Sequence, residues 1–221
     1  MEDFCDVLEL SGVSWIRDRV YFDNSTKKEG NNWTFTMPFT ERSGKILDDK
    51  GVKGDVQTSL PIERMSVSKQ GIVSVLLKNE NAPMIVCYDA AGNVLAELKT
   101  SFASTGYPMD ISISEDGTLL LVSYMYVENG TIMTKVVYYS FAGEATNNKE
   151  FEVVADKYAG MVAPSVFFMD DSVSAVVGDD RLLLYKGKDV PELQQEIILE
   201  KEIKSITYNE RYIGLVLKNE G

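Results

Sequence analysis

The feature that most constrains the fold is a hairpin pattern that recurs along the chain. Residues 65–77 and 111–124 each place a polar, glycine-containing turn between two runs of alternating or continuous apolar residues. Their first halves, MSVSKQG and ISISEDG, match position by position. Alternation with a period of two indicates strands, and the glycine supplies the positive φ of a short hairpin turn. Each copy therefore predicts two antiparallel strands.

The hairpin belongs to a larger repeating unit. Residues 165–178 and 205–217 are two further copies of it. A third strand that ends near a glycine turn, usually after a tyrosine, recurs at residues 46–51, 84–92, 135–143 and 181–187. Another short strand follows most of these turns, as in NVLAELK, EFEVVA and EIILE. The unit is therefore four strands.

Four-stranded units of roughly 40–50 residues are typical of propeller blades. One such sheet has two faces to cover, and stacking neighbours around an axis buries both. We predict an all-β fold, a β-propeller-like array of four-stranded antiparallel blades, with about four to five blades in one domain over residues 1–221. The expected blades span residues 1–60, 61–106, 107–160 and 161–203, with a partial blade over 204–221.

Two places in this pattern leave alternatives open. Residues 189–203 have some helical character, but Pro191 and the strand-like run EIILE favour a loop and a strand. About four and a half blades would leave open sheet edges. We therefore expect either a longer natural protein or an irregular, partly open array.

Composition excludes several functions. The formal net charge of −12 argues against nucleic-acid and anionic-membrane partners, because binding phosphates requires clustered Lys and Arg. The chain has no histidine, which removes Ser-His-Asp and Cys-His catalysis and the commonest zinc ligand. Cys5 and Cys87 have no neighbouring base, so neither is predicted to be a nucleophile, and whether they pair is open. No apolar run is long enough to span a membrane, and the acidic N-terminus does not resemble a signal peptide.

Aspartates at predicted turns are the main candidates for chemistry. They are Asp48–Asp49, Asp170–Asp171, Asp179–Asp180 and Asp116, which precedes Gly117. Paired carboxylates suit calcium ligation or acid–base catalysis, and an Asp-Gly turn suits calcium or phosphate binding. Aspartate is also favoured in turns because its carboxylate accepts hydrogen bonds from nearby backbone N–H groups. The turn interpretation is preferred throughout, so we predict no catalytic residue, no metal site and no cofactor.

Aromatic residues are the remaining candidates. Tyr88, Tyr139 and Tyr185 occupy the same place in three units. They could form a stacking platform for sugars, but we expect them to pack between blades with their hydroxyls at the rim. Trp33 is the best candidate for an exposed aromatic side chain, although core or edge packing is favoured for it too.

With these units identified, the chain resembles a bacterial family known as domain of unknown function 5711. The resemblance is carried by GYPMDISISEDGTLLLVSYMYVENG, TKVVYYSFAG, SVFFMDDSVSAVVGDDRLLLYKGK and EIKSITYNE. It covers residues 105–221 well and the first hundred residues weakly. It implies WD-repeat-like propellers of Gram-positive anaerobes with an N-terminal membrane anchor and an extracytoplasmic domain. It implies no activity and no site residue. A bacterial source also argues against glycosylation at the three Asn-x-Ser/Thr triplets, which begin at Asn24, Asn32 and Asn129.

The expected function is binding or scaffolding at the bacterial cell surface. The blade repeats, the acidic composition and the lack of a catalytic constellation lead to it. The partner would be an unknown protein or carbohydrate, with no nucleic acid, and the membrane would be reached only through an anchor absent from this chain. The alternative is a carbohydrate-active hydrolase or lyase, which needs carboxylates of several blades to converge within about 5–10 Å. A third hypothesis is that the domain is a structural spacer that binds no ligand.

Overall fold

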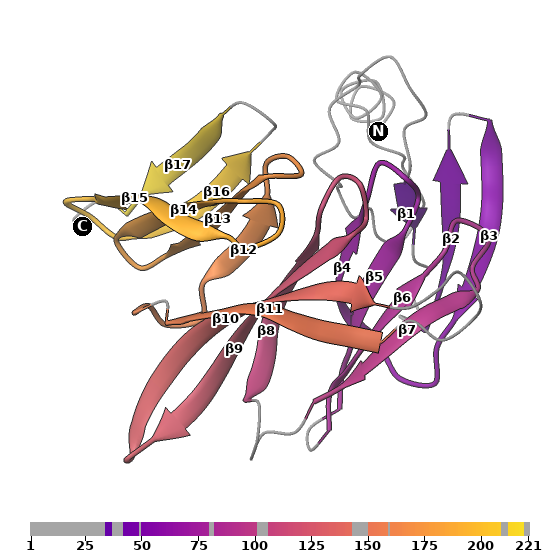
Figure 1. Cartoon of the computed structure of the whole chain (residues 1–221), viewed down its shortest axis with the longest axis horizontal. Helices are drawn as coiled ribbons and strands as arrows, with labels where there is room; N and C mark the ends of the chain where they lie inside the picture. The colour runs from indigo at the N-terminus through magenta and orange to yellow at the C-terminus, as the bar shows by residue number, and fades with distance from the viewer. Residues whose placement is uncertain are drawn as a thin grey trace.

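The computed structural model describes residues 34–36, 42–48, 50–79, 82–100, 106–142, 150–158, 160–208 and 212–218. These described residues form strands β1 to β17 and contain no helix (Figure 1). Consequently, no helix in this part of the chain is long and apolar enough to cross a membrane. In Figure 1 the sheets follow one another from the indigo strands on the right to the yellow strands on the left.

Three sheets have four antiparallel strands each, arranged in chain order. Blade 2 contains β4 (Ile62–Val67), β5 (Val73–Leu77), β6 (Met84–Tyr88) and β7 (Val94–Lys99). Blade 3 contains β8 (Tyr107–Ile113), β9 (Leu119–Glu128), β10 (Thr131–Ala142) and β11 (Glu150–Tyr158). Blade 4 contains β12 (Ser165–Phe168), β13 (Val173–Gly178), β14 (Arg181–Lys186) and β15 (Glu192–Ile198). The predicted array of four-stranded antiparallel blades is confirmed.

Two smaller sheets flank these three. Blade 1 contains β1 (Thr34–Thr36), β2 (Ser43–Asp48) and β3 (Gly51–Gln57), and blade 5 contains β16 (Ile203–Tyr208) and β17 (Ile213–Leu217). Residues 189–203 include β15 and the first residue of β16, so the predicted loop and strand are confirmed for this segment. That the whole chain forms one domain stays a prediction.

The first hairpin of each blade is shaped by short polar side chains at its turn. In blade 2, Ser68 Oγ accepts a hydrogen bond from the N–H of Ile72 at 3.0 Å. In blade 3, Ser114 Oγ accepts one from the N–H of Leu119 at 2.9 Å. Gly117 has a φ of 72°, which a residue without Cβ adopts at low cost. The Ser and Gly positions of the recurring pattern are therefore turn-forming positions.

The first strands of blades 2, 3 and 4 are linked to one another by equivalent serines. Ser66 Oγ on β4 accepts a hydrogen bond from the N–H of Ile113 on β8 at 3.0 Å. Ser112 Oγ on β8 accepts one from the N–H of Phe168 on β12 at 3.1 Å. One hydroxyl in blade 2 and one in blade 3 thus each join their blade to the next.

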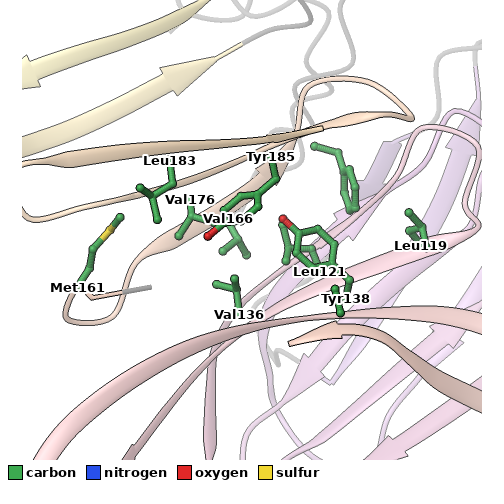
Figure 2. Close-up of a cluster of buried hydrophobic side chains, with 11 residues drawn as sticks. Leu119, Leu121, Val136, Tyr138, Met161, Val166, Val176, Leu183 and Tyr185 are labelled. Carbon is green, nitrogen blue, oxygen red and sulfur yellow. The ribbon is translucent and has the colours of Figure 1, made fainter. Parts of the chain in front are cut away.

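Hydrophobic clusters fill the seams between neighbouring blades. Between blades 3 and 4, Val136 and Tyr138 of β10 face Val176, Leu183 and Tyr185 (Figure 2). The Tyr138 ring packs edge-on against the Tyr185 ring with 6.0 Å between centroids. Similar clusters join blades 1 and 2, blades 2 and 3, and blades 4 and 5. All five residues of β5 are buried because its blade has a neighbour on each face.

Blade 5 is covered on one face only within the described residues. The Tyr208 ring stacks on Phe167 of blade 4 with 3.6 Å between centroids. Ile206 and Leu215 pack against the same blade 4 cluster and are partly buried. On the opposite face, Val216 is 54% exposed. Partly buried and exposed residues alternate along β16 and β17 because one face of this sheet is covered and the other is open.

Candidate functional site

The antiparallel topology gives the array two ends with different contents. The turns after the first and the third strand of a blade lie at one end, which we call the turn rim. The starts of the first strands and the connections between the second and third strands lie at the other end, which we call the arm rim. The sequence-predicted aspartates are divided between these two ends.

At the turn rim, the structure brings together two of the predicted acids. The N–H of Asp116 in blade 3 donates to Asp171 Oδ1 in blade 4 at 2.7 Å. Lys188 Nζ lies 2.6 Å from Asp116 Oδ2, and Glu115 forms an ion pair with Lys69 of blade 2. These three carboxylates are all engaged by a lysine or a backbone N–H. The resulting chain of contacts joins three blades.

The pKa of Asp116 is set by two opposing influences. Partial burial raises it, but hydrogen bonds from Lys188, Thr118 and Ser114 outweigh that effect and lower the pKa from 3.8 to about 2. Ser114 Oγ lies 2.8 Å from Asp116 Oδ1. Asp116 is therefore ionised at neutral pH and holds no proton for general-acid catalysis.

Asp170 and Asp48 bond to the backbone of their own turns. Asp170 Oδ1 accepts hydrogen bonds from the N–H groups of Ser172 and Val173, both at 2.7 Å. Asp48 Oδ1 accepts one from the N–H of Lys50 at 2.8 Å. These are the capping bonds that the turn interpretation predicts. Asp49 lies outside the described residues.

At the arm rim, Asp179 and Asp180 have separate partners. Asp179 Oδ2 accepts a hydrogen bond from the N–H of Val162 at 3.0 Å. Asp180 Oδ1 lies 3.4 Å from Arg181 Nε in an exposed ion pair. Among the described residues, no group of three or more cysteine, aspartate and glutamate side chains is placed to hold a metal ion.

The three repeated tyrosines lie in the core. Tyr88, Tyr139 and Tyr185 are 5%, 5% and 3% exposed. They pack between blades as predicted, so they present no stacking surface. The expectation that their hydroxyls reach the rim is wrong for Tyr139, because its hydroxyl lies 3.0 Å from that of buried Tyr124. Burial is the main reason that the pKa of Tyr88 is raised to about 12.

Of the other sequence candidates, two lie within the described residues and four lie outside them. Cys87 is buried in β6, and the described residues do not include its potential partner Cys5. The candidates outside the described residues are Cys5, Asn24, Asn32 and Trp33. Asn129 is exposed and lies at the tip of the β9–β10 hairpin.

The most distinctive surface element was not singled out as a site by sequence reasoning. β9 and β10 continue beyond the rest of blade 3, since the last β9 residue paired to β8 is Met125. We call residues 126–133 the arm, and within the described residues their strand pairing is only with one another. The arm projects at the lower left of Figure 1. Its tip is Asn129-Gly130, with φ of 50° and 78°, as in a two-residue hairpin turn.

The two faces of the arm differ in chemistry. Val127 and Ile132 lie directly opposite each other on one face and are 54% and 55% exposed. On the other face, Tyr126 is opposite Met133, and Lys135 Nζ lies 5.7 Å from the Tyr126 ring centroid. Aromatic, methionine and aliphatic side chains are typical of the centre of protein interfaces. A sequence signal did exist, because the Asn-Gly dipeptide sits between two long β-rich runs.

Comparisons with solved structures show the fold. The chain matches Kluyvelomyces marxianus Hsv2 with a TM-score of 0.53 and 12% identity, over 82% of this chain and 63% of that one. It matches the WD40 domain of Toxoplasma gondii coronin with a TM-score of 0.55 and 9% identity, over 81% and 45%. The chain therefore spans less than two thirds of the length of either structure. At such identities, the likeness supports a propeller-like fold and nothing more.

Sequence comparisons place the chain in a family. A search of the curated proteins finds no match. The model of a family of unknown function, DUF5711, matches residues 41–221. The match begins well before residue 105, so the similarity reaches further toward the N-terminus than the sequence resemblance indicated. Because the matched residues make up most of the chain, this protein belongs to the DUF5711 family.

Proposed function

We propose that this propeller-like domain is a protein-binding module and that the arm is its main contact element. The observation that carries the proposal is the exposed pair Val127 and Ile132 on a projecting two-stranded element. These two exposed side chains do not pack in the hydrophobic core of the domain. Burying a side chain of this size against a partner contributes roughly 1.5–3 kcal/mol.

The surroundings of the arm support a protein partner. The neighbouring start of β4 carries Arg64, whose side chain is 53% exposed, and β8 begins with partly buried Tyr107. Arginine and tyrosine dominate the binding energy of many protein interfaces. A projecting hairpin with an apolar centre and a polar rim fits a groove on a folded protein.

We propose further that the domain works at the bacterial cell surface, on the extracytoplasmic side, as a binding or scaffolding part of an anchored protein. The proposed anchor is a transmembrane segment. The resemblance to the DUF5711 family supports this location. Cleavage of the domain by protease added to intact cells tests it, because a cytoplasmic domain would be protected.

A carbohydrate-active enzyme finds less support. The acids that meet at the turn rim are Glu115, Asp116 and Asp171, and each is engaged by a lysine or a backbone N–H. A glycosidase needs one protonated and one ionised carboxyl group facing a substrate. The pKa of Asp116, lowered to about 2 despite partial burial, is opposite to that of a proton donor.

Site-specific photo-crosslinking in cells tests the arm as a binding element. A photoreactive amino acid replaces Val127 or Ile132 in the full-length protein, and the matched control replaces Val153. Val153 lies on the outer strand of the same blade and is 62% exposed. We expect light-dependent adducts with one protein from the two arm positions and none from position 153.

The partner identified in this way is then purified, and its affinity for variants is measured. The double variant V127S/I132S should weaken binding about tenfold or more, because two buried aliphatic contacts are lost. V153S should leave the affinity unchanged. Equal crosslinking from position 153, or unchanged affinity of the double variant, would rule out the arm as the contact element.

A further inference from the structure

The tip of the arm is the sole Asn-Gly step in the sequence. Asn129 and Gly130 are exposed and form the loop between the paired residues Glu128 and Thr131. A Cβ added at Gly130 would meet nothing within 4 Å, so the space around this residue is open. Neither Asn129 nor the N–H of Gly130 has a hydrogen-bond partner among the described residues. The side-chain amide and the peptide nitrogen that follows it are therefore unrestrained neighbours.

The two groups can join in a five-membered ring at one particular backbone angle. The ring closes when Cβ of Asn129 eclipses the nitrogen of Gly130 about the Cα–C bond. In an L-residue this occurs at a ψ of about −120°, the angle of the first central residue of a type II′ turn. The φ values of 50° and 78° are those of a type I′ turn, whose first central residue has a ψ of about +30°. Rotating the peptide between Asn129 and Gly130 interconverts the two turns.

Gly130 permits this rotation while the flanking strands stay paired. Its φ of 78° becomes about −80° in the type II′ turn. Glycine adopts both signs of φ at little cost and places no Cβ beside the attacking nitrogen. A type II′ turn prefers glycine as its first central residue, so this tip adopts it only transiently. The arm thus reaches the ring-closing geometry without unfolding.

We propose that Asn129 is a site of spontaneous deamidation through a cyclic imide formed with Gly130. A base in the solvent removes the N–H proton of Gly130, and the nitrogen attacks Cγ of Asn129. The N–Cγ bond forms, the Cγ–Nδ2 bond breaks, and the amide group takes up a proton and leaves as ammonia. Water then opens the imide. Its addition at Cγ gives aspartate, and its addition at the backbone carbonyl carbon gives isoaspartate, in which the chain runs through Cβ.

Both products change the arm tip. The new carboxylate adds a negative charge next to Glu128. Isoaspartate also lengthens the backbone by one atom, so the loop can no longer join Glu128 to Thr131 as a two-residue turn. The exposed pair Val127 and Ile132 lies directly beside these residues in the hairpin. The reaction itself depends only on the geometry of the tip and not on the proposed binding role of the arm.

Asn93 supplies a reference within the same chain, because it is also exposed but is restrained. Its Nδ2 donates a hydrogen bond to Asp89 Oδ2 at 3.0 Å, and its N–H donates one to Asp89 Oδ1 at 2.9 Å. The next residue is Val94, whose β-branched side chain crowds the attacking nitrogen. Asn93 should therefore keep its amide under conditions that convert Asn129.

Timed incubation of the purified protein at mildly alkaline pH, followed by peptide mapping, tests the proposal. Each product gains about 1 Da in mass, and chromatography separates aspartate from isoaspartate. Position 129 should convert at least about tenfold faster than position 93, because a β-branched neighbour is absent. The variant N129G/G130N keeps the length and composition of the arm but places the asparagine before Thr131. It should convert at least about tenfold more slowly than the wild type.

The same protein unfolded in guanidinium chloride is the positive control. An intact Asn129 in the folded protein, at a time when the unfolded chain has converted, would overturn the proposal, because the turn would then block ring closure. Equal conversion of N129G/G130N and the wild type would also overturn it, because the glycine would then have no role in the reaction.

Discussion

At the scale of single residues, Gly92 determines how closely blades 1 and 2 approach. It lies in the turn between β6 and β7 with a φ of 87°. A Cβ at this position would lie 2.4 Å from the carbonyl oxygen of Asp55 on β3. Gly54, also on β3, faces the same turn, where an added Cβ would lie 2.4 Å from the carbonyl carbon of Ala91. Two glycines without side chains thus permit direct backbone contact between the two blades.

Replacing Gly92 with alanine should therefore destabilise the fold by about 2 kcal/mol or more, because backbone strain and a backbone clash add together. Gly130 provides the matched control, since its φ is 78° and an added Cβ would meet nothing within 4 Å. G130A should cost about 1 kcal/mol from strain alone. Urea unfolding of both variants measures the difference. Equal losses would contradict a clash at position 92.

The lowered pKa of Asp116 makes a pH-dependent prediction. A carboxyl group whose pKa falls from 3.8 to about 2 on folding stabilises the folded state above pH 3.8. That contribution is lost as the pH falls toward 2. D116N should therefore have a lower free energy of unfolding than the wild type near pH 7. This difference in free energy should become smaller below about pH 4.

Urea unfolding across this pH range checks the prediction for Asp116. D55N is the control, because the Lys45–Asp55 pair spans 3.8 Å with side chains 57% and 66% exposed. Such exposed pairs contribute about 0–1 kcal/mol, so D55N should behave like the wild type. A difference in free energy of unfolding between D116N and the wild type that stays constant as the pH falls would refute the proposed electrostatic contribution.

At the scale of elements, the arm is separable from the blade that carries it. Residues 126–133 add no strand partner to blade 3, and Met125 pairs directly with Thr134 at the base. Replacing residues 127–132 by a two-residue Asn-Gly turn between the paired Tyr126 and Met133 removes two residue pairs, so it keeps the register and the turn type. Thermal unfolding should then show a melting temperature within a few degrees of the wild type, about the shift that 1 kcal/mol causes.

This deletion also separates folding from binding. The shortened chain should keep its β-sheet circular dichroism spectrum and lose affinity for the partner proposed above. Replacing residues 129 and 130 with Gly-Asn in the intact arm is a control that preserves its length. A large fall in melting temperature on deletion would show that the arm contributes to the core of blade 3.

At the scale of the whole molecule, a single serine hydroxyl contributes a hydrogen bond to each of two seams between blades. Ser112 is 5% exposed, and its removal would leave the N–H of Phe168 without this partner. S112A should lower the free energy of unfolding by about 1–3 kcal/mol, the cost of an unsatisfied buried donor. S66A should act similarly on Ile113. The double variant should show additive losses, because the two serines serve different seams.

Chemical denaturation of the single and double variants measures these losses. Ser74 is a control, since it is fully buried and its Oγ makes a long 3.4 Å hydrogen bond within blade 2. S74A should cost less than either seam variant. A double variant that loses far less than the sum would mean that both hydroxyls act on one cooperative unit rather than on separate seams.

Local sequence was sufficient to predict the strands and their repetition. Hairpin turns are defined by a few neighbouring residues, such as Ser114 and Gly117, so their chemistry is visible in the pattern itself. The same holds for the capping role of Asp170, whose hydrogen-bond partners lie two and three residues away. The recurrence of Tyr139 and Tyr185 at the same place in their units also predicted that they pack between blades, where both are buried.

Contacts between distant residues were decided by the tertiary structure alone. Asp110 accepts the N–H of Val166, and Asp116 donates its N–H to Asp171, across seams that bring residues 56 and 55 positions apart together. No local pattern marks Asp110 as a largely buried acid, because its exposure depends on how blades 3 and 4 pack. The alternation of apolar and polar residues and the residues at the turns thus determined the strands of each blade, since both act over a few residues. The packing of one blade on the next decided which side chains meet, because that depends on distances that only the folded array sets.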